Sequence, residues 1–158
     1  MPRLSVDIDL TYLPLQPREE SLIGISEALI RIKAKIIKAL PGVVAQEGRV
    51  DGRVAKLLVR GAEGLIKIEP NFVIRGAVQV PVGRDLCPKA KEEFGMSVGI
   101  KTLANADLFG GKICAALDRQ HPRDFFDIKI LLENEGITPE IRMVPTEALK
   151  DHKTSLDS

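Results

Sequence analysis

The chain has 158 residues, the length of one ordinary domain, and its 44% hydrophobic and 28% charged residues are typical of a globular protein. Lys and Arg number 23 against 22 Asp and Glu, and the net charge of +1 excludes a whole-molecule field for nucleic acid or anionic membrane. No apolar run approaches the roughly 18–20 residues of a membrane span, and the start lacks the apolar core of a signal peptide. We therefore expect a cytoplasmic protein with no membrane partner, in which Cys87 and Cys114 are buried free thiols.

The first part of the chain predicts a strand followed by a long helix. Residues 3–11 alternate polar and apolar side chains, which is the pattern of a half-buried strand. From there to Leu40, apolar residues recur every three or four positions, and Pro41-Gly42 supplies the helix stop. Three further isoleucines widen the apolar stripe, so we expect this helix to pack on a sheet over a broad face: Ile23, Ile30 and Ile37.

Short elements are expected in the middle of the chain. Residues 54–60 and 65–69 are apolar runs joined across a glycine-containing turn, which predicts a β-hairpin. Residues 72–80 predict a further strand and residues 81–84 a turn. A short helix over 89–94 and a short strand over 96–101 follow.

The last third of the chain predicts two helices. They span residues 105–119 and 122–135, broken before Pro122 and ended by Gly136, with Phe125 and Phe126 in the core. Beyond Arg142 the periodicity is lost. We predict an α/β (α+β) protein, a mixed sheet with flanking helices and a helical C-terminal part, with one domain over residues 1–142 and a disordered tail over 143–158.

Asp7 and Asp9 stand two positions apart in the first predicted strand, so their carboxylates leave the same face about 6.5–7 Å apart. Like charges this close repel, and a divalent cation between them would relieve the repulsion. Carboxylate oxygens are the ligands that Mg²⁺ prefers. Two interpretations stay open, a metal site and the solvated face of an edge strand.

Glu69 ends another predicted strand, on the same side as Lys67. A third carboxylate on a neighbouring strand would complete the set that two-metal phosphoryl chemistry uses. The alternative is that Lys67 and Glu69 form only a cross-strand ion pair, which contributes little.

Basic residues share one face of the helix predicted over 105–119. Lys112 and Arg119 lie about 10 Å apart along it and can either grip phosphates or form an exposed basic stripe. Gly110-Gly111 is costly in a helix, and the missing side chains allow close approach of a ligand or another backbone.

The run from residue 119 to residue 127 concentrates polar groups at a helix start. Asp124 and Asp127 share a face, and Arg123 and Asp127 are spaced to pair. His121 is either a loop or capping residue or a catalytic base. The sequence contains no Walker phosphate loop, dinucleotide-binding fingerprint or zinc spacing.

Four of these pieces in order resemble the AbiEii family of nucleotidyltransferase-like toxins. They are Arg3-x-Ser5-x-Asp7-Ile-Asp9-Leu10, Ile66-Lys67-Ile68-Glu69, Gly110-Gly111-Lys112-x-x-Ala115-x-x-x-Arg119 and Arg123-Asp124-x-x-Asp127. The resemblance implies the polymerase-β-like nucleotidyltransferase fold and the role of a toxin in abortive-infection and toxin–antitoxin pairs. It also implies a nucleoside triphosphate substrate, an RNA or protein acceptor and a cognate antitoxin.

The resemblance also implies roles for single residues. Asp7, Asp9 and Glu69 would be catalytic carboxylates that hold Mg²⁺ or Mn²⁺, and Asp127 would be the late catalytic aspartate. The other matched positions would bind substrate: Ser5, Lys67, Lys112, Arg119 and Arg123.

The chain departs from the family pattern at both ends. Family members carry a Gly-Gly-Thr or Gly-Ser phosphate-binding segment before the aspartate pair, and we expect this chain to lack it. Missing phosphate donors would weaken transfer chemistry. The alternative hypothesis is therefore a catalytically inactive remnant that binds nucleotide, metal or a partner and self-associates through exposed edges. Metal-dependent phosphodiester hydrolysis ranks third.

Overall fold

The computed structural model describes residues 7–62, 64–72, 75–134 and 136–144, without the side chains of Asp118, Arg119 and Arg123. The chain forms two compact units, Met1–Gly76 and Ala77–Ser158. No composition shift marks this boundary in the sequence.

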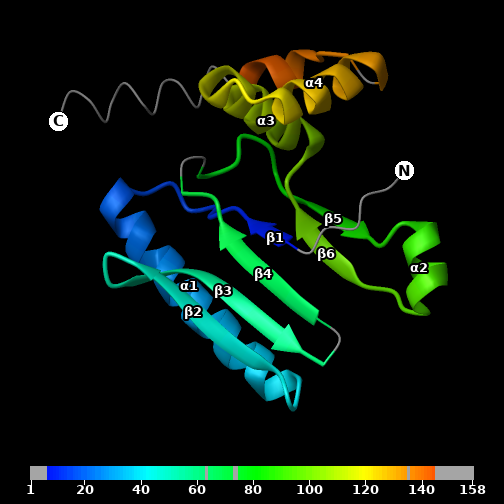
Figure 1. Ribbon diagram of the computed structural model, residues 1–158. Helices are drawn as coiled ribbons and strands as arrows, with labels where there is room; N and C mark the ends of the chain where they lie inside the picture. Colours follow the sequence, from blue (N-terminus) through cyan, green and yellow to red (C-terminus); the bar gives the residue numbers. More distant parts are fainter. Residues whose placement is uncertain (1–6, 63, 73–74, 135, 145–158) are drawn as a thin grey trace. The chain divides into compact units, whose positions relative to one another are not determined.

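The first unit is a four-stranded mixed sheet in the order β1-β4-β3-β2, with a long helix packed on one face (Figure 1). Its strands are β1 Asp7–Leu10, β2 Val44–Val50, β3 Arg53–Gly61 and β4 Gly64–Pro70. β1 pairs with β4 in parallel, and the other pairs are antiparallel. The helix α1, Arg18–Ala39, follows β1 in the chain, so the parallel pairing is made by a crossover connection. This confirms the mixed sheet with a flanking helix.

Period-two alternation divides the two faces of this sheet. Leu57 and Ile68 pack with Ile25 and Leu29 of α1, and Leu57 is 0% exposed. The residues at the alternate positions of β1 and β4 therefore point to the face opposite α1. That opposite face carries the polar side chains described below.

The helix covers the sheet over a narrower face than expected. Ile25 and Leu29 are buried, but Ile23, Ile30 and Ile37 are 46–47% exposed, so the prediction that they widen the packed face is wrong. The three isoleucines are seven residues apart, so they lie along one line of the helix surface. This line is on the side of the helix away from the buried Ile25 and Leu29.

The strand β2 was not predicted, although its turn has a clear signal. Asp51 and Gly52 connect β2 and β3 with positive φ angles of 49° and 77°, which is the Asp-Gly form of a two-residue hairpin turn. β2 lacks the apolar alternation that would have revealed it, because Glu47, two positions after the buried Ala45, is charged and binds Lys33 of α1.

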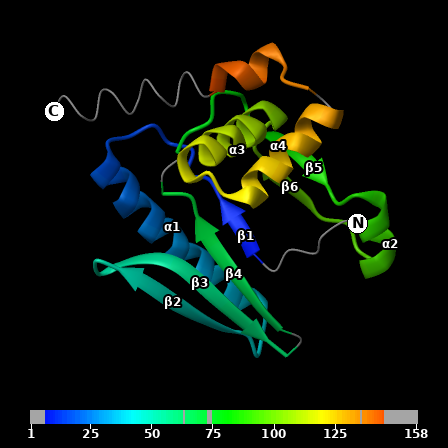
Figure 2. The same cartoon turned by 45° about the horizontal axis from the view of Figure 1, so that its top comes forward.

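The second unit combines a two-stranded antiparallel sheet with a helical pair (Figure 2). Its elements are β5 Val82–Asp85, α2 Pro88–Phe94, β6 Gly99–Thr102, α3 Asn105–Arg119 and α4 Pro122–Asn134. Residues 139–144 are also helical. The core is small: Ala106, Leu131, Ile141 and Val144.

Several predictions for this part of the chain are wrong. The described residues 75–80 form no strand, and the segment predicted as a turn over 81–84 lies largely in β5. Phe125 and Phe126 are exposed rather than in the core. Cys87 is exposed at the start of α2, so only Cys114 is partly buried, and burial raises the pKa of its thiol.

A buried carboxylate joins helix α3 to the segment before β5. Asp107, in the first turn of α3, is 6% exposed and accepts hydrogen bonds from the backbone N–H groups of Val78 at 2.8 Å and Gln79 at 3.0 Å. These bonds satisfy two backbone N–H groups that form no hydrogen bond to a neighbouring strand.

No helix in the described residues is long and apolar enough to cross a membrane.

Candidate functional site

The pairing of β1 with β4 brings the predicted carboxylates together. In this parallel register Asp7 lies beside Lys67, and Asp9 lies beside Glu69. Residues in register on neighbouring strands point to the same side, and so do residues two apart on one strand. All four side chains therefore share the face of the sheet opposite α1. The register therefore shows that the three predicted carboxylates share one face of the first unit's sheet.

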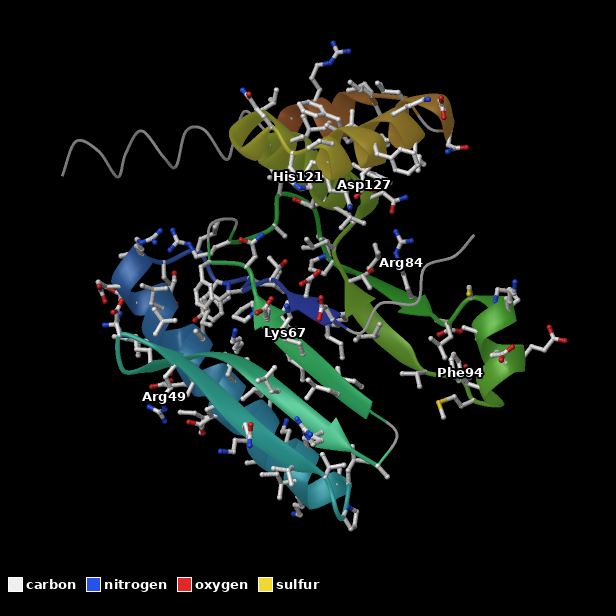
Figure 3. The ribbon with its side chains drawn as sticks, viewed as in Figure 1. Arg49, Lys67, Arg84, Phe94, His121 and Asp127 are labelled. Atoms are coloured by element: carbon white, nitrogen blue, oxygen red, sulfur yellow. The ribbon has the colours of Figure 1, made fainter. Side chains whose placement is uncertain are left out.

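Lys67 lies within this group of carboxylates (Figure 3). Its Nζ is 3.1 Å from Oε2 of Glu69 and 3.7 Å from Oδ1 of Asp7. The hydrogen bond to Glu69, with the charges of Asp7 and Glu69, raises the pKa of the Lys67 ammonium above its ordinary value. Lys67 thus pairs both within its strand and across to β1.

Sequence reasoning missed one residue of this cluster. Lys56 of β3 places its Nζ 4.0 Å from Oε1 of Glu69. The signal was the antiparallel hairpin register, which sets Lys56 opposite Glu69 once Leu57 pairs with Ile68. Glu69 therefore has two lysines near it.

The carboxylate of Asp9 differs from the other two. Among the described residues no side chain forms an ion pair or hydrogen bond with it.

The carboxylate oxygens of this face are suitable ligands for a divalent ion, but the side chains do not bring them close together. Three carboxylates on adjacent strands of one face supply hard oxygen ligands. In the described part of the chain, however, no three His, Cys, Asp or Glu side chains come close enough together to hold a metal. The ammonium of Lys67 ties Asp7 and Glu69 into ion pairs instead.

The second unit brings two further predicted residues together. Nζ of Lys112, on α3, donates a hydrogen bond of 2.7 Å to Oδ2 of Asp127, on α4 (Figure 3). Both side chains are partly exposed. The pair holds the lysine ammonium in place at the junction of the two helices. The expected partner of Asp127, Arg123, lies outside the residues whose side chains are described.

Other features flagged in this region have structural explanations. A side chain at Gly110 would collide with Val144, so this glycine allows close packing of the segment 139–144. His121 is exposed, and its backbone carbonyl accepts hydrogen bonds from the N–H groups of Asp124 and Phe125, so it starts the helix α4. These two backbone hydrogen bonds are those of the capping position of a helix.

Three predicted substrate-binding residues stay predictions. Ser5 and the tail over 145–158 lie outside the described residues, and so do the side chains of Arg119 and Arg123.

A family model describes the whole chain. The model of the "Nucleotidyl transferase AbiEii toxin, Type IV TA system" family matches residues 1–158. The chain belongs to this family. No curated protein and no solved structure matches it.

Membership in the AbiEii family agrees with the architecture. The mixed sheet of the first unit and the added helices are consistent with a nucleotidyltransferase-like fold, which confirms the predicted fold class. The AbiEii family is a nucleotidyltransferase-like toxin family of toxin–antitoxin systems, so an antitoxin partner and a nucleotide substrate are the partners that the family suggests.

Proposed function

We propose that this AbiEii-family protein transfers a nucleoside monophosphate from a nucleoside triphosphate to an RNA or protein acceptor, and that the reaction depends on Mg²⁺. In this reaction an acceptor oxygen bonds to the α-phosphorus, the bond from that phosphorus to the pyrophosphate oxygen breaks, and the acceptor proton is lost to solvent. Pyrophosphate leaves. The family assignment supports the reaction class.

One observation carries the proposal. The parallel register of β1 and β4 sets Asp9 beside Glu69 and Asp7 beside Lys67 on a single sheet face. Acidic side chains concentrated in this way repel one another, and a cation between them would relieve the repulsion. Lys56 and Lys67 supply two positive charges beside three carboxylates, which leaves a net negative charge for a divalent ion to balance.

Asp7, Asp9 and Glu69 would hold the metal ion. When bound, Mg²⁺ orients the triphosphate and offsets the charge that develops at the α-phosphorus. For all three carboxylates to serve as ligands, Lys67 must release Asp7 and Glu69. We propose that the released ammonium then pairs with a phosphate oxygen of the substrate, which fits its role as a substrate-binding residue.

In the second unit we propose that Lys112 contacts substrate phosphates and that Asp127 holds its ammonium for this purpose. The 2.7 Å hydrogen bond between them supports this assignment because it limits the positions of a long, flexible side chain. Ser5, Arg119 and Arg123 are the remaining substrate-binding candidates, and Asp127 is retained as a catalytic candidate.

The test is label transfer with a matched control. The protein is incubated with each α-labelled nucleoside triphosphate, Mg²⁺ and total RNA, and the labelled product is treated with ribonuclease or protease to identify the acceptor. We expect Asp9→Asn to abolish label transfer, because it removes the charge of the carboxylate that no described side chain pairs with. Asp51→Asn is the control, because it makes the same change in the β2–β3 turn, where Asn also accepts a positive φ. Equal label transfer by wild type and Asp9→Asn would contradict the proposal.

A second candidate is a catalytically silent protein that binds nucleotide, metal or partner. The ion pairs of Lys67 with Asp7 and Glu69 favour it, because they are what a purely structural cluster would form. Nucleotide or metal binding without label transfer to any acceptor would support this candidate. Release of free nucleoside monophosphate would instead support hydrolysis.

A further inference from the structure

Helix α1 has a second apolar line that its own sheet does not cover. Ile23, Ile30 and Ile37 are 46–47% exposed and repeat every seven residues along a helix of 22 residues. Side chains seven apart lie two turns apart on nearly the same line, so the three isoleucines form a stripe. We call them the isoleucine stripe. Half-exposed branched side chains aligned in this way form an apolar ridge that a facing helix can cover.

The charges beside the stripe divide sharply along the helix. Glu20 and Glu27 lie three positions before and four positions after Ile23, and Arg31 and Lys38 directly follow Ile30 and Ile37. Residues three or four positions from an isoleucine adjoin it on the helix surface, so Glu20 and Glu27 border the stripe. Arg31 and Lys38 lie about 100° further round the helix from the isoleucines they follow, so they flank the stripe at a greater distance, and Arg31 also pairs with Glu27 within the helix at 3.8 Å. The first half of α1 therefore presents acidic groups and the second half presents basic groups.

This division has two physical explanations. Acidic residues near a helix start and basic residues near its end complement the helix macrodipole. That effect explains the charges but does not explain three aligned, half-exposed isoleucines. Self-complementarity explains both, because an antiparallel copy of the same helix places its basic half against the acidic half of the first.

We propose that α1 forms an antiparallel dimer interface with α1 of a second copy of this chain. The two-fold axis passes near Ile30, so Ile23 packs against Ile37 of the partner subunit, and the acidic and basic halves face each other. A helix of 22 residues is about 33 Å long, which makes a small interface. We expect a dissociation constant on the order of tens of micromolar, as for other small interfaces.

The dimer leaves the carboxylate face open. The helix packs on the sheet face opposite Asp7, Asp9, Lys67 and Glu69, because Leu57 and Ile68 on the other side of the strands contact it. The proposal is therefore independent of the proposed catalysis. Label transfer per protomer should be the same for monomer and dimer.

Sedimentation velocity from low micromolar to submillimolar protein is the first measurement. We expect reversible dimerisation that Ile30→Lys abolishes, while Leu65→Lys retains it. Leu65 is the matched control because it is 45% exposed on β4 of the same unit, away from α1. Circular dichroism confirms that each variant is folded. A monomer at every concentration, or a dimer that Ile30→Lys leaves intact, would overturn the proposal.

A charge-swap experiment tests the antiparallel pairing. The double variants E20K/E27K and R31E/K38E each give the four charged positions beside the isoleucine stripe a single sign, so we expect both to be monomeric alone and to form a heterodimer when mixed. Failure of the mixture to associate, or persistence of either homodimer, would contradict the pairing. Disulfide cross-linking tests the register. When Ile23→Cys and Ile37→Cys, each in a C87S background, are mixed and oxidised, we expect a cross-linked dimer. The C87S protein alone measures the cross-linking that arises through Cys114. A mixture that cross-links no more than that background would exclude the antiparallel register.

Discussion

Replacing the buried carboxylate of Asp107 should destabilise the second unit severely. Its two oxygens each accept a backbone N–H bond, from Val78 at 2.8 Å and from Gln79 at 3.0 Å, at a side chain that is 6% exposed. Hydrogen bonds to a charged acceptor contribute about 1.5–3 kcal/mol each. Asp107→Ala removes both hydrogen bonds, and water that enters the space replaces part of them. We therefore expect the free energy of unfolding to fall by about 3 kcal/mol. Asp107→Asn keeps one acceptor oxygen and should cost about half as much.

The assay uses the distribution of chromophores in the chain. Urea unfolding followed by circular dichroism detects the helices of both units. Fluorescence of Tyr12, the only tyrosine in a chain without tryptophan, reports on the first unit alone. Hydrogen exchange at the amides of Val78 and Gln79 reports on the two bonds directly. We expect Asp107→Ala to shift the dichroism transition and to accelerate exchange at these two amides.

Asn105→Ala is the matched control for Asp107. Asn105 accepts a hydrogen bond from Arg84, but the contact is exposed, so its loss should shift the transition by less than about 1 kcal/mol. Equal stability of Asp107→Ala and Asn105→Ala, with unchanged exchange at Val78 and Gln79, would refute the reasoning.

Two further predictions concern the first unit. Leu57→Ala should lower the free energy of unfolding by about 3 kcal/mol, because Leu57 is 0% exposed. Urea unfolding monitored by Tyr12 fluorescence measures this change. Leu65→Ala should lower the free energy of unfolding much less, because that side chain is 45% exposed. Equal losses of unfolding free energy in the two variants would contradict the assignment of Leu57 to the core. Hydrogen bonds from Lys33 and then Arg49 lower the pKa of Glu47 below its ordinary value of 4.5. Its contribution to stability is therefore present above that value and lost as the pH falls below it, so wild type and Glu47→Gln should converge in thermal midpoint in acid. A constant difference would contradict this.

Local sequence patterns predicted the elements whose periodicity is unbroken. The helix α1 and the hairpin of β3 and β4 follow from apolar spacing and glycine turns, because neighbouring residues determine both. β2 was not predicted because the position that alternates with its buried Ala45 is the charged Glu47, which binds Lys33 of α1 and adds no apolar side chain to the pattern. The exposed isoleucine stripe was misassigned for a different reason. The hydrophobicity of a side chain shows that it can be buried, but it does not show whether its own sheet or another surface covers it.

The candidate site was predicted in part for a similar reason. Alternation alone places Asp7 and Asp9 on one face of a strand. That Glu69 lies beside Asp9 depends on the parallel pairing of β1 with β4, which are separated by α1 and a hairpin. Such non-local pairing leaves no mark in the spacing of residues. The pairing of Lys112 with Asp127 depends likewise on how α3 packs against α4.

The central claim is that the face shared by Asp7, Asp9 and Glu69 binds a divalent cation. Calorimetric titration with Mn²⁺ and with Mg²⁺, with and without nucleoside triphosphate, tests it most directly because it measures binding independently of any acceptor. We predict saturable binding by wild type and by Asp51→Asn, strengthened by the triphosphate and lost in Asp9→Asn. Binding that Asp9→Asn leaves unchanged, or no binding by the wild type with the triphosphate present, would contradict the claim.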